Sequence, residues 1–232
     1  QLQAEVDVTS GVALDAALPA STFQQHFLLL HLLQPHAASY SLPVAMKWPS
    51  RYAQPLVRAA LQLLVRRHAV LRTLYEMSQI GVLQIILPAD GFVIPLDECS
   101  ERDWRAQTAQ TTIRPFALTT APPVRARLAC SEGWPRRPPL VAVDHVAADY
   151  ASTLTLKKEL SLACRALHRG GPPPSALPNL QLQYADFSLW RQRYHRVGDA
   201  TATLEWWRGK LHGAPPLLEL PLDRPRQPAD PA

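Results

Sequence analysis

Residues 140–143 form an uninterrupted apolar run, and this run is the feature that most constrains the fold. A strand that is apolar on both faces must be covered by other elements on both sides. Amphipathic helix patterns occur before and after it, because apolar residues recur every three or four positions in residues 54–68 and again in residues 152–167. Helix and strand patterns alternate along the chain, so the sequence predicts an α/β (α+β) layer structure with helices packed on a sheet.

Further elements are predicted from the same periodicities. The predicted helices are residues 24–33, 54–68, 152–167, 184–195 and 203–211. The predicted strands are residues 41–48, 71–77, 81–87, 92–96, 124–130 and 140–143. Ser152 is expected to cap the third helix, because its hydroxyl can accept a hydrogen bond from a free backbone N–H. Arg125 and Arg127 alternate with apolar side chains in their strand, and we expect them to face outward.

Proline marks the connecting segments. The chain has 23 prolines in 232 residues, whereas ordinary usage of about 5% gives about 12. They cluster in residues 172–174, 215–216 and 221–231, which indicates connectors and extended chain. We therefore expect a lead-in at residues 1–16, one compact unit at residues 17–213 and an extended proline-rich segment at residues 214–232.

Charge and composition argue against several classes of protein. The net charge is +5, but the arginines are spread along the chain rather than gathered into a stripe, so we do not expect nucleic-acid binding. No apolar run approaches the ~20 residues that cross a bilayer, so we expect no membrane partner. Cys99, Cys130 and Cys164 are far apart and lack metal-ligand spacing. We therefore expect no metal site and a reducing, cytoplasmic compartment.

The segment that follows residues 140–143 carries the candidate chemistry. The buried strand delivers His145 to its C-terminal end, and Asp149 follows just before a predicted helix. Loops held by a rigid scaffold often present reactive side chains. A histidine with an ordinary pKa near 6.5 can accept or donate a proton at neutral pH. His145 is therefore a candidate catalytic residue, although a lone histidine is more often structural.

His145 and Asp149 have the spacing of the HHxxxDG motif of nonribosomal peptide synthetase condensation domains, members of the chloramphenicol acetyltransferase-like superfamily. Other segments resemble this family in the same order. Residues 21–30 resemble its SxAQ segment, and residues 67–75 (RHAVLRTLY) resemble its RHExLRTxF motif. Residues 114–125 resemble its PFDL…PLLR segment, residues 184–190 (YADFSLW) resemble its YxDFAxW motif, and residues 206–226 resemble its inter-lobe linker. The resemblance covers nearly the whole chain but only the first half of the family's domain. It implies an α/β (α+β) sandwich, one chloramphenicol acetyltransferase-like lobe with a mixed sheet flanked by helices.

The resemblance also implies a function and roles for particular residues. It implies amide-bond formation between a donor acyl thioester and an acceptor aminoacyl group, both on phosphopantetheine arms of carrier protein domains. His145 would lie beside the attacking amine, as a general base or as a group that positions the amine. Asp149 would form a salt bridge with Arg72 and so support the loop that carries His145. The domain itself would bind no cofactor, and its partners would be the carrier proteins and the C-terminal lobe.

Two departures from the family motif leave alternatives open. Asp144 stands where the first histidine is usual, and Tyr150 stands where glycine is usual, so a bulky side chain could narrow the active-site tunnel or alter the backbone. Asp144, Asp149 and Ser152 also fit the DxxxxDxxS motif of heterocyclization domains, which condense and then dehydrate. The alternatives to condensation are therefore heterocyclization, epimerization, or a lobe that no longer catalyses and serves to dock carriers. A single lobe is expected to be inactive by itself.

Overall fold

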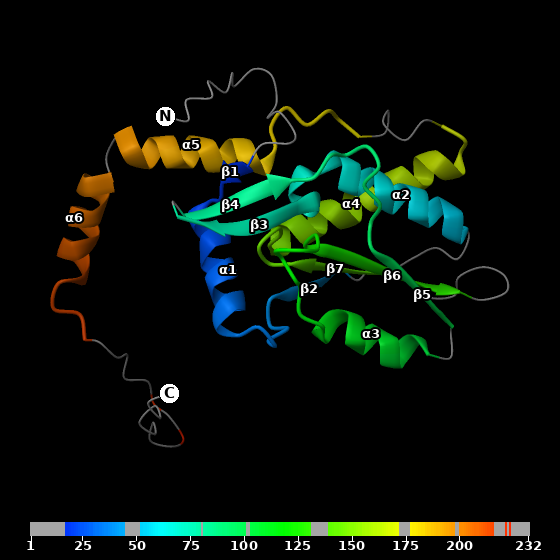
Figure 1. Cartoon of the computed structure of the whole chain (residues 1–232), viewed down its shortest axis with the longest axis horizontal. Coiled ribbons are helices and arrows are strands. Elements are labelled where there is room, and N and C mark those ends of the chain that lie inside the picture. Colours follow the sequence, from blue (N-terminus) through cyan, green and yellow to red (C-terminus); the bar gives the residue numbers. More distant parts are fainter. Residues whose placement is uncertain are drawn as a thin grey trace. The chain divides into compact units, whose positions relative to one another are not determined.

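The structure is a computed structural model that describes residues 17–44, 52–79, 81–100, 103–130, 139–171, 177–197, 200–215, 221 and 223. The chain divides into two compact units, residues 1–192 and residues 193–232. The expected lead-in at residues 1–16 lies outside the described residues, as does most of the expected proline-rich segment. The candidate chemistry lies entirely in the first unit, whose elements are coloured from blue to yellow in Figure 1.

Two sheets form the centre of the first unit (Figure 1). The four-stranded sheet has the order β2 (Ser41–Val44), β7 (Leu140–Asp144), β6 (Val124–Cys130) and β5 (Leu96–Ser100). Its outer pair β5–β6 is parallel and its other pairs are antiparallel. The three-stranded sheet is antiparallel, in the order β1 (Ala17–Pro19), β4 (Gly81–Ile86) and β3 (Thr73–Ser78). The prediction of a mixed sheet flanked by helices is confirmed.

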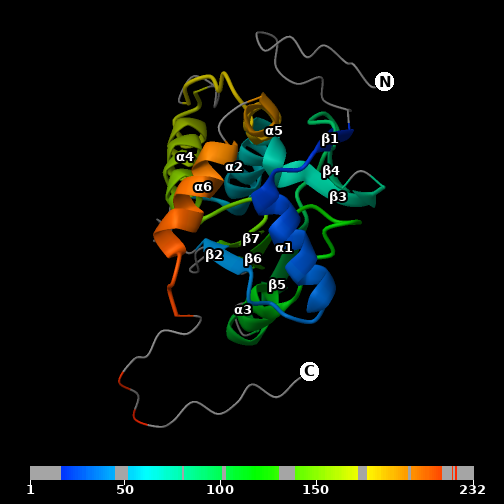
Figure 2. The same ribbon diagram turned by 90° about the vertical axis from the view of Figure 1, so that its left-hand side faces the viewer.

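The β7 strand is covered on both faces, as its apolar run predicts. Val141 and Val143 pack on α2 (Gln54–Arg67) and α4 (Tyr150–His168), which lie side by side on one face of the sheet. On the other face Ala142 joins a cluster with α1 (Thr22–Leu33), and Leu140 packs against Trp104 of α3 (Trp104–Ile113). Figure 1 and Figure 2 show α3 across this sheet from α2 and α4.

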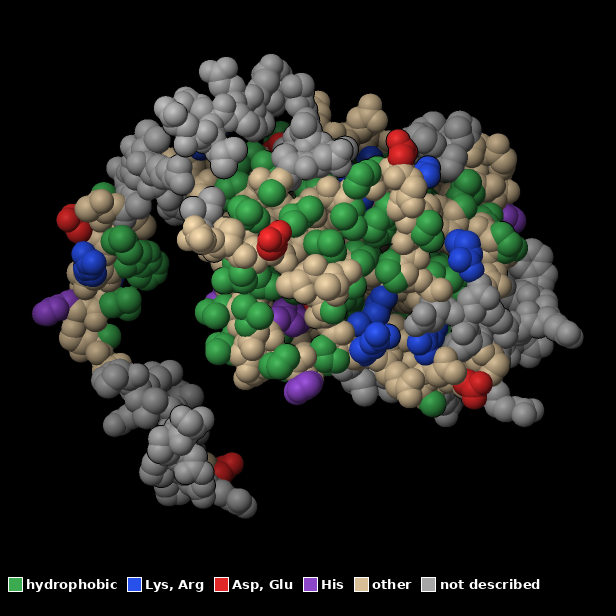
Figure 3. Space-filling model, viewed as in Figure 1, with side chains coloured by type: hydrophobic (Ala, Val, Ile, Leu, Met, Phe, Trp, Pro, Cys, Tyr) green, Lys and Arg blue, Asp and Glu red, His purple; other side chains and the backbone are tan. Residues whose placement is uncertain are grey.

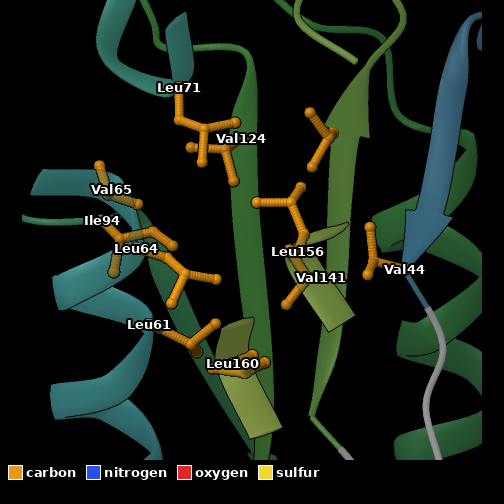
Figure 4. Close-up of a pocket in the computed structure, with 11 residues that line it drawn as sticks. Val44, Leu61, Leu64, Val65, Leu71, Ile94, Val124, Val141, Leu156 and Leu160 are labelled. Atoms are coloured by element: carbon orange, nitrogen blue, oxygen red, sulfur yellow. The ribbon is translucent and has the colours of Figure 1, made fainter. Parts of the chain in front are cut away.

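The core between the sheet, α2 and α4 contains a cavity of about 20 Å³ (Figure 4). Its eleven lining residues are all leucine, isoleucine or valine, including Val44, Leu64 and Leu156. A space of this size with no polar lining stays dry. It is a packing gap and not a ligand site.

The structure differs from the sequence expectations at four elements. The α3 helix was not predicted, because its sequence is rich in threonine and glutamine and lacks an apolar stripe. Residues 92–95 are not a strand, and β5 begins only at Leu96. The β3 strand begins at Thr73, after a 3₁₀ helix at Ala69–Arg72. The α4 helix begins at Tyr150, so its N-cap is Asp149 and not Ser152.

The missed helix also changes the environment of two arginines. The Nε atom of Arg125 donates to the carbonyl oxygen of Thr111 at 2.8 Å, and its guanidinium lies 3.9 Å from the ring centre of Phe116. Arg127 donates to the side-chain oxygen of Gln107 at 2.7 Å. The expectation that both arginines face outward is therefore wrong, because α3 and the segment after it cover that face of β6.

The remaining predicted helices are present. α1 and α2 match their expected ranges within two residues, and α5 (Tyr184–Val197) and α6 (Ala200–Leu211) are helical as predicted. Cys164 is buried in α4, and burial raises the pKa of its thiol to about 12, as expected of a small core residue. The side chains of Cys99 and Cys130 lie outside the described part of the chain. In that part, no helix has both the length and the apolar character needed to cross a membrane.

Candidate active site

His145 lies in the turn that directly follows β7. Its backbone N–H donates to the carbonyl oxygen of Tyr40 at 2.8 Å, which ties this turn to the segment that leads into β2. Its imidazole stacks on the ring of Phe27 in α1, with a centroid distance of 4.6 Å and an interplanar angle of 10°. The ring of Phe23, one turn earlier on the same helix, has its centroid 5.9 Å from that of the His145 ring. The half-buried ring is thus oriented by aromatic packing.

Among the residues that the structure describes, no carboxylate is hydrogen-bonded to the His145 ring. Its Nδ1 atom is buried and has no hydrogen-bond partner among the described residues. The carboxylate of Asp149 instead accepts from the backbone N–H of Ser152 at 2.7 Å and from its hydroxyl at 2.6 Å. His145 and Asp149 therefore do not form the hydrogen-bonded pair found in catalytic triads.

Asp149 is an exposed N-cap of α4. The hydrogen bonds from the side chain and the backbone of Ser152 lower the pKa of its carboxyl group, and a positive charge on nearby His145 adds to the effect. A negative charge at a helix N-terminus is also favoured by the helix dipole. Asp149 thus fixes the point at which the His145 turn becomes helix α4.

The expected salt bridge between Asp149 and Arg72 is not formed between these two described side chains. Arg72 is buried at the end of its 3₁₀ helix, and burial lowers the pKa of its guanidinium group. It donates to three carbonyl oxygens, those of Leu87 at 2.7 Å, Arg66 at 3.1 Å and Val65 at 3.2 Å. Two of these carbonyls belong to the last turn of α2, so Arg72 caps that helix and ties it to the end of β4.

Asp144, at the first variant position, is almost fully buried at the end of β7. One carboxylate oxygen accepts from the backbone N–H of Val146 at 2.9 Å. The other lies 2.9 Å from Nε2 of His31 in α1, and the side chains of both residues are less than 10% exposed. His31 was not identified as a candidate site residue from the sequence. The sequence feature that could have indicated it is its position four residues after Phe27, on the same face of the helix.

A pocket of about 570 Å³ lies beside the turn that carries His145. Its lining comes from the start of α1, the turn after β7, the start of α4 and the first part of α5. Its polar side chains include Asp149, Ser152, His26, Tyr184 and Arg191. The pocket can therefore receive a ligand that carries both apolar and polar groups.

Comparison with known proteins assigns this arrangement to a family. The condensation domain family matches residues 15–232 of the chain. The chain belongs to this family. It is similar to phosphinothricin tripeptide synthetase PhsB of Streptomyces viridochromogenes, with 35% identity over 227 residues that cover 94% of this chain and 19% of that protein. It is also similar to a dimodular nonribosomal peptide synthase of Bacillus subtilis, with 33% identity over 222 residues that cover 93% of this chain and 9% of that protein.

Solved structures show a similar fold. The X-domain from teicoplanin biosynthesis, in its complex with OxyB, is 28% identical to this chain with a TM-score of 0.74, and the match covers 94% of this chain and 49% of that one. This condensation-domain chain therefore spans about half of a solved relative and at most a fifth of the two curated relatives named above. This coverage agrees with the interpretation of the chain as one lobe of a condensation domain.

The family motif around Arg67 and His68 joins α2 to α4. Glu159, which is buried in α4, contacts Nε of Arg67 at 3.1 Å and Nε2 of His68 at 2.6 Å. Gln183, just before α5, accepts from the backbone N–H of Ala69 and donates to the carbonyl oxygen of Arg67, both at 3.0 Å. This segment of the condensation domain therefore has a structural role.

The opening motif of the condensation domain forms a buried polar network. Ser21 and Gln24 make a capping box at the start of α1. Gln24 also donates to the hydroxyl of Tyr75 at 3.0 Å, and the Ser21 hydroxyl lies 2.9 Å from that of Tyr184 in α5. Burial raises the pKa of the fully buried Tyr75, which therefore stays neutral. The network fixes α1, and with it Phe27, relative to the three-stranded sheet and α5.

Tyr150, at the second variant position, causes no backbone strain. Among the described residues, only glycines have positive φ angles, so this position does not need a glycine. Tyr150 begins α4, its side chain is 76% exposed, and it is not among the residues that line the pocket. In this lobe the tyrosine leaves the space beside His145 open.

Proposed function

We propose that this chain is the N-terminal lobe of a condensation domain that forms an amide bond between two acyl groups carried on phosphopantetheine arms. The nitrogen of the acceptor amine attacks the carbonyl carbon of the donor thioester. A C–N bond forms, the C–S bond breaks and the donor arm leaves as a thiol. The amine loses one proton, and the departing thiolate gains one.

The observation that carries this proposal is the position of His145, which directly precedes Val146 and packs near Phe23, two residues that line the pocket, while the imidazole itself is not one of the lining side chains. A neutral imidazole can accept the amine proton and return it to the thiolate, or it can hold the amine by a hydrogen bond. Packing against Phe27 limits the rotation of the ring before any substrate binds. An amine attacks a thioester readily once it is aligned, so positioning supplies much of the rate.

The same proposal includes the partners. Carrier protein domains would bring the phosphopantetheine arms, and the second lobe of the domain would cover one side of the reacting groups. α1 leaves four large apolar side chains exposed: Phe23, Leu29, Leu32 and Leu33. Figure 3 shows apolar side chains, with histidines among them, on the face over α1 and the three-stranded sheet. Such a surface fits contact with another protein domain. We place the reaction in the cytoplasm, where thiol arms stay reduced.

A single-turnover assay tests the reaction. The chain is joined to the second lobe of its domain and mixed with a loaded donor carrier and a loaded acceptor carrier, and the products are measured by intact mass. We expect an amide on the acceptor carrier and a loss of at least about 100-fold in rate for His145→Ala. The matched control is His36→Ala, which removes an exposed histidine beyond the end of α1. An amide formed at the wild-type rate by His145→Ala would contradict the proposal.

The similarity to the X-domain supports a second candidate, a lobe that docks a protein without catalysis. That X-domain is in a complex with OxyB, so a domain of similar fold can serve as a binding surface. The two variant positions, Asp144 and Tyr150, motivate the same candidate. In the assay above, this candidate predicts carrier binding without acyl transfer.

Heterocyclization predicts a product one water lighter than the amide. The geometry does not favour heterocyclization. The carboxylate of Asp144 lies against His31 and does not line the pocket, whereas Asp149 and Ser152 do. Epimerization predicts a change in stereochemistry without transfer. The same mass measurement, followed by chiral analysis of the released acyl group, separates these outcomes.

A further inference from the structure

Two residues one turn apart on α1 contact two consecutive residues of the turn after β7. Positions four apart share a helix face. The ring of Phe27 stacks on the ring of His145, and Nε2 of His31 lies 2.9 Å from the carboxylate of Asp144. Tyr40 joins the two contacts, because its ring packs edge-on against both Phe27 and His31. One helix face therefore controls both the side chain of His145 and the residue before it.

Asp144 holds the main chain on both sides of His145. Its backbone N–H donates to Pro123, and its carbonyl oxygen accepts from the N–H of Ala147 at 3.0 Å. One carboxylate oxygen accepts from the N–H of Val146, while the other meets His31. The conformation of the turn therefore depends on the direction of this carboxylate.

A buried carboxylate requires a partner, because removal from water penalises its charge. The side chain that lies against it is His31, whose Nε2 lies 2.9 Å from Oδ2 of Asp144, a contact at ion-pair distance that lacks the geometry of a hydrogen bond. The hydroxyl of Tyr75 is a further titratable group near Asp144, in addition to the adjacent His145, and it is held by Gln24. Without His31, the only contact left to the carboxylate among those named here is the hydrogen bond from the N–H of Val146.

We propose that His31 and Asp144 form a positioning pair that sets the orientation of the His145 imidazole. The proposal rests on the proposed function for its effect on rate, but not for its effect on structure. Neither member of the pair lines the pocket, so both act through His145 and not by contact with substrate. The pair gives a role to the aspartate at the first variant position of the motif.

The structural half of the proposal is tested on the 232-residue chain by NMR with ¹⁵N- and ¹³C-labelled histidine. The ring of Phe27 shifts the His145 ring signals. We expect His31→Leu to move these signals toward their positions in an unstructured peptide and to broaden them. His31→Gln places an amide N–H near the position of Nε2, so it is expected to restore most of the native shift. His36→Gln is the control and leaves the His145 signals in place. Unchanged His145 signals in a folded His31→Leu chain would overturn the proposal.

The catalytic half is tested by amide formation with the complete domain. We expect His31→Leu to lower kcat by about 10- to 100-fold, because small displacements of a reacting group cost rates of this size. KM for the loaded carriers is expected to change by less than about threefold, since no substrate contact is lost. His31→Gln is expected to recover most of kcat.

Asp144→Asn is the second variant, because it keeps the side-chain volume if His31→Leu does not fold. In the double variant with His31→Gln, the loss is expected to be smaller than the product of the two single losses. Full kcat in His31→Leu or in Asp144→Asn overturns the pair as a positioning device. If the wild-type domain forms no amide while His31→Leu still moves the His145 signals, the proposed function fails and the pair stands.

Discussion

At the scale of single residues, the lobe relies on buried polar groups that bind the main chain. Arg72 shows this most clearly, because its guanidinium group bonds to three carbonyl oxygens and not to the carboxylate of Asp149. Residue type and motif identified Arg72 as important. They could not identify its partners, because three backbone oxygens leave no pattern in a sequence.

Removal of the Arg72 side chain should destabilise the lobe. We expect Arg72→Leu to lower the free energy of unfolding by about 2–4 kcal/mol, because buried carbonyl oxygens lose a charged donor. Arg72→Lys should cost less than Arg72→Leu, because its ammonium group keeps a charged donor for part of this set of oxygens. Urea unfolding monitored by circular dichroism measures both. Arg66→Leu is the control, because the Arg66 side chain is exposed and its loss should change stability by less than about 0.5 kcal/mol.

The carboxyl group of Asp149 should titrate below its usual range. Ser152 lowers its pKa, so the stabilisation from this carboxylate is fully present above the unfolded pKa of about 3.9 and is lost as the pH falls through the folded value. Ser152→Ala should raise the pKa of Asp149 toward about 3.9. A titration of the side-chain ¹³C signal between pH 2 and pH 6, with Ser161→Ala as the control, measures the shift. An unaltered Asp149 pKa in Ser152→Ala would show that another group sets it.

At the scale of elements, α2 and α4 are held together by Glu159 as well as by the apolar core. Its carboxylate meets both Arg67 and His68 at the end of α2. Glu159→Leu leaves the guanidinium of Arg67 and the imidazole of His68 without their partner, so we expect a loss of about 3–5 kcal/mol in the free energy of unfolding. Lys158→Leu, at an exposed position next to it, should change stability by less than about 0.5 kcal/mol. Thermal and urea unfolding of both variants check the difference, and equal stabilities would contradict it.

The elements that could be predicted are those with a strong apolar period. The run at 140–143 and the stripes of α2 and α4 led to the correct layers and to a strand covered on both faces. α3 could not be predicted in this way, since it covers the sheet with Trp104 and with backbone oxygens that bind Arg125. The site follows the same division: the place of His145 after β7 was predictable, but its contact with Phe27 and the pairing of Asp144 with His31 depend on how α1 packs.

At the scale of the whole molecule, the exposed apolar side of α1 distinguishes this lobe from a self-sufficient domain. Leu29 is 54% exposed and Leu33 is 69% exposed, although both are large and apolar. Replacement of both by serine should change the stability of the chain alone by less than about 1 kcal/mol, because little surface is buried there. The same change should weaken binding of a separately produced second lobe by at least about tenfold, through the loss of apolar contact.

Isothermal titration of the two lobes measures this difference. The control is Val93→Ser, which removes an apolar side chain that is 72% exposed but lies far from α1 in the sequence. Equal affinity of the wild-type chain and the double serine variant for the second lobe would mean that this side of α1 is not the contact surface.

The pairing of Asp144 with His31 has a consequence for attempts to improve the protein by comparison with its relatives. Restoration of the usual histidine at position 144 would place two imidazoles together in a space that excludes water, with no carboxylate between them. The substitution would restore the family motif, but it would destabilise this turn unless residue 31 were changed as well. Asp144 and His31 should therefore be exchanged together in any chimeric synthetase built from this lobe, even though 113 positions separate them in the sequence.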